Sequence, residues 1–158
     1  MLEILFVLAF TLHNIEEGIW LPRWSKHIEK YHPRITNNEF HFALIAITTC
    51  GYLLTFLFLM YGQSLAVIGY IYTGFLLMMC LNTIFPHLLA TIILRKYAPG
   101  TLTGLLLNLP IGMVVIIRNV NNGLILYKLF LILAIIVIVT MVLLRLFFKL
   151  GGRLIEAY

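Results

Sequence analysis

Long apolar segments separated by short polar connections run the length of this 158-residue chain. About 20 consecutive apolar residues cross the hydrocarbon core of a bilayer as a helix. Segments near that length or longer cover residues 2–20, 40–60, 65–94, 101–117 and 124–148. The pattern predicts an all-α fold, a polytopic membrane helix bundle of about five transmembrane helices, with residues 1–158 forming a single integral membrane domain.

Proline and polar residues interrupt the third and fourth predicted spans. The third contains Asn82, Pro86 and His87, so we expect it to kink near Pro86. The fourth is broken by Asn108 and Pro110, and the proline leaves a backbone carbonyl one turn earlier without its helical partner. The last span is almost entirely Leu, Ile, Val and Phe, and we expect it to serve as scaffold.

The connection between the first and second spans is polar and basic. Two neighbouring stripes recur there at helical spacing, one of Trp24, Ile28, Tyr31 and Ile35 and one of Arg23, Lys26, Lys30 and Arg34. They predict a short interfacial amphipathic helix that begins near Pro22, ends before Pro33 and lies on anionic headgroups. A basic mouth that gathers anionic lipid substrates is the alternative interpretation.

Composition also indicates a membrane protein. The chain is 62% hydrophobic and 11% charged, whereas soluble domains are about 45–50% apolar and about 25% charged. The formal charge of +5 comes from basic residues that flank apolar runs, which favours membrane lipids over nucleic acid as the partner. Cys50 and Cys80 fall inside predicted spans and are interpreted as small apolar filler.

The distribution of basic residues predicts an orientation. Counted near alternate connections, nine Lys and Arg residues gather on one side of the membrane and two on the other. The positive-inside tendency then places the N-terminus outside and the C-terminus in the cytoplasm. The N-terminal segment lacks a basic leader and a small-residue cleavage site, so we expect it to be retained in a multi-pass protein.

Ionisable residues inside the first span are the strongest functional signal. His13, Glu16 and Glu17 occupy an apolar segment, where charged side chains are costly and usually mark a metal, proton or substrate pathway. Because the glutamates follow His13 by three and four residues, a helix would place both beside its ring. A bound cation, protonation or a facing polar group would each neutralise the pair.

Depth along the helices predicts that other spans contribute to the same site. At about 1.5 Å of rise per residue, His13, His87 and Asn108 each lie about 10–12 Å from the cytoplasmic end of their span. Glu16 and Glu17 lie slightly nearer the cytoplasm. The first, third and fourth spans are therefore expected to meet around a shared polar chamber.

Imidazole and carboxylate groups in this arrangement suit a divalent transition metal: zinc, iron or manganese. The expected metal ligands are His13, Glu16, Glu17 and His87. Glu16 or Glu17 is also the expected catalytic base, because a carboxylate can activate a metal-bound water. Residues expected to orient ligands or bind substrate are Asn82, Asn108 and His41.

Three sequence elements together resemble a known family. They are His13-Asn14-Ile15-Glu16-Glu17, the stretch from Asn82 to His87, and Arg95 to Gly100 leading into Thr103 and Leu107-Asn108-Leu109-Pro110. The chain is similar, up to about Gly112, to the HXXEE family of small bacterial and archaeal membrane proteins. The resemblance implies a prokaryotic plasma membrane and, through the family's further histidine, a role for His87. It implies no particular reaction.

The first functional hypothesis is a metal-dependent membrane enzyme, of hydrolase or oxidoreductase type, acting on a lipophilic or lipid-like substrate near the cytoplasmic side. One alternative is a proton- or cation-coupled transporter or ion-binding protein, which would need a homodimer because five spans are few and no repeat is visible. Another is a metal-free intramembrane glutamate protease, although Arg23 falls two residues too late for that family's Glu-Glu-x-x-x-Arg pattern. A structural or assembly factor is the remaining possibility.

Overall fold

The structure is a computed structural model that describes residues 1–25 and 37–156. The described residues are almost entirely helical and contain five helices long and apolar enough to cross a membrane. The expected all-helical fold with five spans is confirmed, and the chain has the length and composition of a multi-pass membrane protein.

The helices differ from the predicted spans mainly at their ends. The first, second and last spans are α1 (Leu2–Ser25), α2 (Asn37–Tyr61) and α7 (Leu126–Glu156). The third span comprises α3 (Ala66–Asn82), the π-helical segment η2 (Thr83–Leu88) and α4 (Leu89–Leu94). The fourth comprises α5 (Thr101–Thr103), the π-helical segment η3 (Gly104–Asn108) and α6 (Leu109–Asn121).

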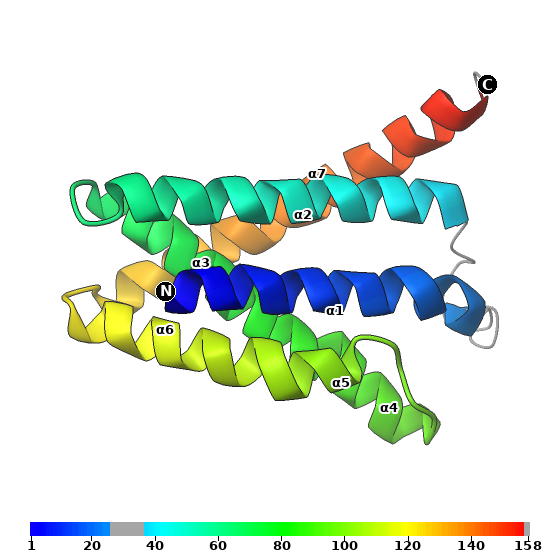
Figure 1. The fold of residues 1–158 in the computed structure, drawn as a ribbon, viewed down its shortest axis with the longest axis horizontal. Helices are drawn as coiled ribbons and strands as arrows, with labels where there is room; N and C mark the ends of the chain where they lie inside the picture. The colour runs from blue at the N-terminus through cyan, green and yellow to red at the C-terminus, as the bar shows by residue number, and fades with distance from the viewer. Residues whose placement is uncertain (26–36, 157–158) are drawn as a thin grey trace.

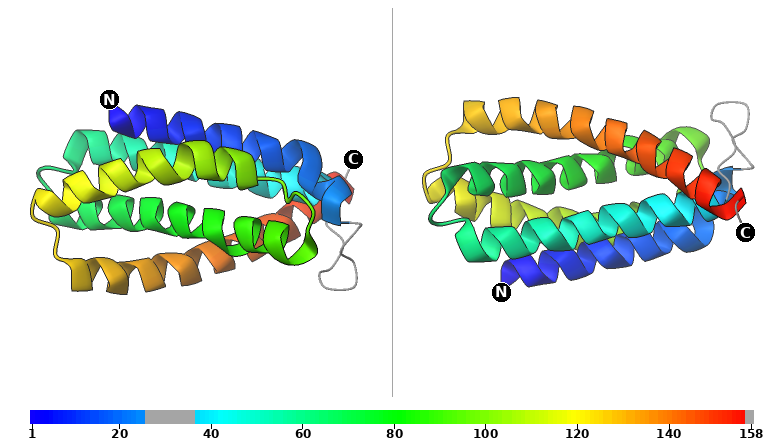
Figure 2. Two further views of the ribbon diagram at one scale, coloured as in Figure 1. Left: turned by 90° about the horizontal axis from the view of Figure 1, so that it is seen from below. Right: turned by 90° about the horizontal axis from the view of Figure 1, so that it is seen from above.

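The five spans form a closed ring of neighbours. α1 contacts α2 and α6, α2 contacts α7, α7 contacts α3, and α3 contacts α6 (Figure 2). The two chain termini lie at opposite ends of the bundle (Figure 1). The C-terminal end of α1, the end of α4 and the start of α5 lie at the same end as the C-terminus (Figure 1). Residues from these three elements can therefore share one site.

The kink expected near Pro86 is present. Phe85 leaves the helical conformation, with φ −127° and ψ 115°, between the end of α3 and the start of α4. The fourth span is also irregular where Asn108 and Pro110 predicted a break, because η3 ends at Asn108 and Pro110 is the second residue of α6.

The first span is longer than predicted. α1 continues through Pro22 to Ser25, so Pro22 lies inside its last turn and does not begin a separate helix. The rest of the predicted interfacial helix falls on residues 26–36, which lie outside the described residues.

Aromatic packing fills the bundle in the half that holds the N-terminus. Phe75 makes edge-to-face contacts with Phe6 and Phe10, with ring centroids 6.3 and 5.4 Å apart. Tyr72, which is fully buried, stacks on Phe58 at 4.3 Å. Such pairs favour association by about 0.5–1.5 kcal/mol beyond the area that they bury. This cluster joins α1, α2 and α3.

Polar side chains also join the spans. Asn14 donates to Thr48 Oγ1 at 2.7 Å between α1 and α2, and Asn119 donates to Thr73 Oγ1 at 2.9 Å between α6 and α3. At the N-terminal end of α1, the buried Glu3 carboxylate pairs with Arg118 of α6. These contacts match the interhelical hydrogen bonds that stabilise membrane bundles.

Gly51 tests the packing of α1 against α2. A Cβ atom there would lie 2.6 Å from Phe10 Cε1 and 3.4 Å from Phe75 Cζ, inside the aromatic cluster. We expect Gly51→Ala to reduce the free energy of unfolding by about 1–3 kcal/mol, measured by thermal unfolding of the purified protein. Gly69→Ala is the control, because its Cβ would meet nothing closer than 3.5 Å. Equal stability of both variants would contradict this packing.

Candidate metal centre

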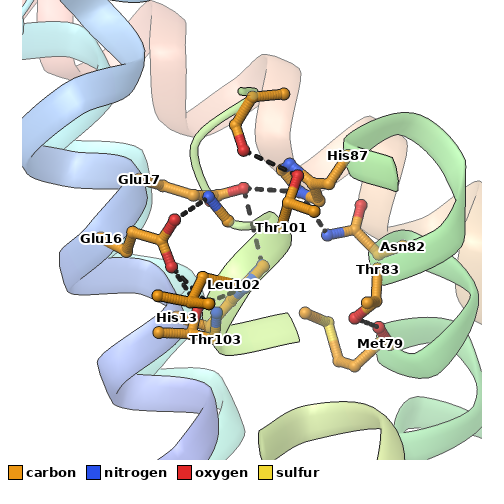
Figure 3. A network of polar contacts seen from close by, with 12 residues as sticks. His13, Glu16, Glu17, Met79, Asn82, Thr83, His87, Thr101, Leu102 and Thr103 are labelled. Carbon is orange, nitrogen blue, oxygen red and sulfur yellow. Dashed lines mark hydrogen bonds and ion pairs between the residues drawn. The ribbon is translucent and has the colours of Figure 1, made fainter. Parts of the chain in front are cut away.

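Two histidines and one glutamate converge between α1 and the kinked third span. The ligand atoms of His13, Glu17 and His87 all lie within 4.8 Å of one another. Glu17 Oε1 is 2.8 Å from His87 Nε2 and 3.6 Å from His13 Nε2. Both histidines are buried, and the Glu17 side chain is 14% exposed. Figure 3 shows these side chains pointing toward each other.

Each ring is placed by a different local feature. His13 and Glu17 are one helical turn apart on α1, so a regular helix puts them on one face. His87 follows the non-helical Phe85 and Pro86 in η2, and the kink brings its ring to α1. The two rings meet edge to face, with centroids 5.1 Å apart.

Gly100 covers both rings. A Cβ atom at this position would lie 2.8 Å from His87 Cε1 and 2.9 Å from His13 Cε1. Its φ of +90° is in the left-handed region that favours glycine. The turn before α5 therefore passes directly over the histidines because it has no side chain there.

Thr103 connects His13 to the neighbouring glutamate. The Thr103 hydroxyl donates to Glu16 Oε2 at 2.6 Å and lies 3.2 Å from His13 Nδ1. Because this hydroxyl has one proton, which goes to the carboxylate, its oxygen must accept from His13 Nδ1–H. Neutral His13 then carries its proton on Nδ1, and its Nε2 lone pair faces Glu17 and His87.

His87 is oriented in the same way. The Nδ1 side of the His87 ring faces Gly100, where a Cβ atom would lie 2.9 Å from Nδ1. Its Nε2 therefore faces Glu17, and Asn82 Nδ2 approaches that atom at 3.1 Å. Asn82 thus lies beside the cluster, as predicted for a residue that orients a ligand.

Glu16 has a different role from Glu17, although the sequence predicted both as ligands. Its carboxylate accepts hydrogen bonds from Gly100 N at 2.7 Å and Thr103 N at 3.1 Å, from the Thr103 hydroxyl, and from the Tyr97 hydroxyl. These donors precede and begin the fourth span, so the carboxylate caps that helix. The structure therefore joins Glu16 to the loop and does not place it in the group of metal-binding atoms.

Tyr97, in the loop before α5, donates one of these hydrogen bonds. Burial and its hydrogen bond to Glu16 raise the pKa of Tyr97 to about 12, so the hydroxyl stays protonated at neutral pH. The same oxygen accepts a hydrogen bond from Leu102 N at 3.1 Å. Tyr97 thus holds the loop before α5 to the first span.

The other two predicted site residues lie elsewhere. His41 Nε2 is 2.8 Å from the carbonyl oxygen of Gly18, in the groove between α1 and α2. Asn108 is fully buried at the end of η3, and its amide atoms have no hydrogen-bond partner among the described residues. His41 is not part of the cluster of His13, Glu17 and His87, and the Asn108 amide makes no hydrogen bond to it.

No site role was predicted for Thr103 or Gly100. Both fall in the segment that carries the family resemblance, and the Pro99-Gly100 dipeptide is a turn signal. That signal predicts a turn but not which side chains the turn covers.

The donor set suits a divalent transition metal. At the usual zinc distance of about 2.0–2.1 Å, ligand atoms of a tetrahedral site lie about 3.4 Å apart, which falls between the 2.8 and 3.6 Å separations from Glu17. Two imidazoles and one carboxylate also leave coordination positions for water or substrate. His13, Glu17 and His87 are the residues that could hold the metal.

Comparison with known proteins gives a family but no activity. The family described as "Protein of unknown function with HXXEE motif" matches residues 4–115. An uncharacterized protein of Bacillus subtilis (strain 168), YrkK, is 48% identical over 149 residues, which cover 94% of each chain. No solved structure matches the chain.

Thr103→Val tests the link between Glu16 and His13. The variant keeps the shape of the side chain but leaves a buried carboxylate oxygen and His13 Nδ1 with fewer partners. We expect the free energy of unfolding to fall by about 1–3 kcal/mol, measured by thermal unfolding. Thr49→Val should change little, because the exposed Thr49 hydroxyl bonds only its own helix at Ile45. A Thr103→Val protein as stable as the control would rule out this role.

Proposed function

Because this chain belongs to the HXXEE family, whose function is unknown, we propose a function from its own site. The chain is a metal-dependent integral membrane enzyme that acts on a lipophilic substrate. A divalent transition metal binds His13, Glu17 and His87. The proposal rests on one observation: two imidazole Nε2 atoms and a carboxylate oxygen converge in a buried site.

Two of the three converging atoms, Glu17 Oε1 and His13 Nε2, are hydrogen-bond acceptors, and His87 Nε2 would bind a metal once it gives up the proton that it donates to Glu17. Thr103 holds the proton of neutral His13 on Nδ1, on the opposite side of the ring from Glu17. Nε2 of His13 is buried without a hydrogen-bond partner. A cation among these atoms would bind the lone pair of His13 Nε2, replace the His87 proton and offset the charge of Glu17 in its apolar surroundings.

The chemistry follows from the ligand set. Zinc with three protein ligands polarises a bound water for attack on an ester, amide or phosphoester, and iron with two histidines and a carboxylate supports oxidation. Glu17 would act as a ligand, while Glu16 would position the His13 ring through Thr103. Because Glu16 already accepts hydrogen bonds from four donors, it is a weak general base.

Two observations favour this enzyme over the alternatives. A metal-free glutamate protease would use both carboxylates at one reaction centre, whereas Glu16 and Glu17 bond different partners. A carrier needs access from both sides of the membrane. Among the described residues, buried Phe6, Phe10 and Tyr72 fill the bundle beyond the site.

The proposed orientation puts the site toward the cytoplasm of a prokaryotic cell. Among the described residues, one end of the bundle carries most of the basic side chains, including Arg95, Lys96, Lys149 and Arg153, and the site lies toward that end (Figure 1). The positive-inside tendency supports a cytoplasmic C-terminus and an outer N-terminus.

Metal content tests the site directly. Protein purified in detergent should carry about one transition metal ion per chain, as a site with three protein ligands requires, measured by inductively coupled plasma mass spectrometry. His13→Ala and His87→Ala should each remove the metal. His41→Ala is the matched control and should retain it, because His41 bonds Gly18 away from the cluster. Loss of metal from all three variants alike, or metal-free wild-type protein after zinc, iron and manganese loading, would refute the site.

Conversion of lipids tests the enzymatic part. Metal-loaded protein incubated with extracted membrane lipids should yield a product visible by lipid mass spectrometry, and a chelator should stop its formation. Glu17→Gln should abolish turnover because it removes the anionic ligand. Metal-loaded protein that leaves every lipid unchanged but moves cations across proteoliposomes would favour the carrier instead.

A further inference from the structure

Two apolar grooves run along opposite sides of the last turns of α1. One lies between α1 and α2, has a volume of about 630 Å³ and is lined by Leu44, Ile45 and Tyr52 among others. The second lies between α1 and the start of the fourth span, has a volume of about 710 Å³ and reaches Trp20 and Leu102. We call them the α2 groove and the α5 groove.

The two grooves share three residues of α1. Ile15, Ile19 and Arg23 line both of them. These residues are four apart, so they form one stripe along the helix. A ligand that fills both grooves must therefore straddle this stripe, with Arg23 at the end nearest the end of the bundle.

The chemistry of the walls defines the ligand. Most of the lining is aliphatic or aromatic, which suits hydrocarbon chains, and the guanidinium of Arg23 suits a phosphate through paired hydrogen bonds. Trp20 and Trp24 line the α5 groove, and tryptophan is enriched at the level of lipid headgroups. The charge thus lies where a headgroup would lie, and the apolar walls lie deeper.

We propose that a two-chain anionic phospholipid binds astride α1. Its phosphate contacts Arg23, and one chain occupies each groove. The claim that this lipid is the substrate class of the enzyme rests on the proposed function. The claim that the lipid binds here rests on the grooves alone.

The α5 groove brings this lipid close to the metal centre. Glu16 and Thr103 line that groove, and Thr103 Oγ1 lies 3.2 Å from Nδ1 of the ligand His13. Glu16 precedes Arg23 by seven residues, about 10 Å along the helix. The part of the lipid nearest the metal is therefore its glycerol and chain region and not its phosphate.

Lipid titration tests the site. Delipidated protein in detergent is titrated with phosphatidylglycerol and with phosphatidylcholine, and bound lipid is counted by native mass spectrometry. Phosphatidylglycerol should bind more tightly, and Arg23→Gln should weaken it about fivefold, the effect of one basic residue near a lipid surface. Arg153→Gln is the matched control, an exposed arginine on α7 that lines neither groove, and should bind as the wild type does.

A separate variant tests whether the two hydrocarbon chains of the lipid occupy the grooves. Ile19→Trp should weaken both lipids because Ile19 lines both grooves, whereas Ile138→Trp, on the exposed face of α7, should not. Lysophosphatidylglycerol, with one chain, should bind more weakly than phosphatidylglycerol. Equal binding of the one-chain and two-chain lipids would overturn the straddling arrangement. Equal binding of anionic and zwitterionic lipid, or no effect of Arg23→Gln, would overturn the phosphate site.

Folding and metal content are measured on the same samples. Arg23→Lys keeps the charge but cannot form the paired hydrogen bonds, so its preference for anionic lipid should fall between those of the wild type and Arg23→Gln. A larger loss in Arg23→Gln than in Arg23→Lys identifies the charge and not misfolding. Metal-free protein that still prefers phosphatidylglycerol would refute the metal enzyme and leave the lipid site standing. Metal-loaded protein without that preference would refute the lipid site and leave the metal centre standing.

Discussion

The site depends on the hydrogen bonds that the Glu16 carboxylate accepts. A charged group inside an apolar bundle is stable only when donors surround it, and here the donors all come from the loop and first turn of the fourth span. The hydrogen bonds to this one carboxylate hold the start of the fourth span in place against α1. The same contacts place Gly100 over the imidazole rings and Thr103 against His13.

The apolar pattern predicted the architecture because each span must satisfy its own backbone inside a membrane. It also predicted the kink at Pro86 and the meeting of His13 with His87, since proline position and depth along a helix are visible in the sequence. Depth along a helix does not predict in which direction a side chain points around the helix axis. His41 therefore bonds Gly18, and the Asn108 amide makes no hydrogen bond to the cluster.

The separation of the two glutamates illustrates the same limit. The spacing from His13 places both near its ring, but consecutive residues on a helix differ by about 100° in direction. Glu17 faces η2 and Glu16 faces the loop before α5. Only the positions of those neighbouring segments decide which carboxylate joins the histidines. One segment, η2, is π-helical, and the other leads through α5 into the π-helical η3. Such stretches are frequent at functional sites.

The long last helix packs mainly against α2 and α3, and in the membrane-spanning window of α7 only 6% of residues are buried. It supplies none of the residues of the candidate metal centre. The family match, which ends at residue 115, stops before this helix begins. Because so little of α7 is buried, most of its side chains are left to meet lipid acyl chains, and its apolar character alone suits that contact.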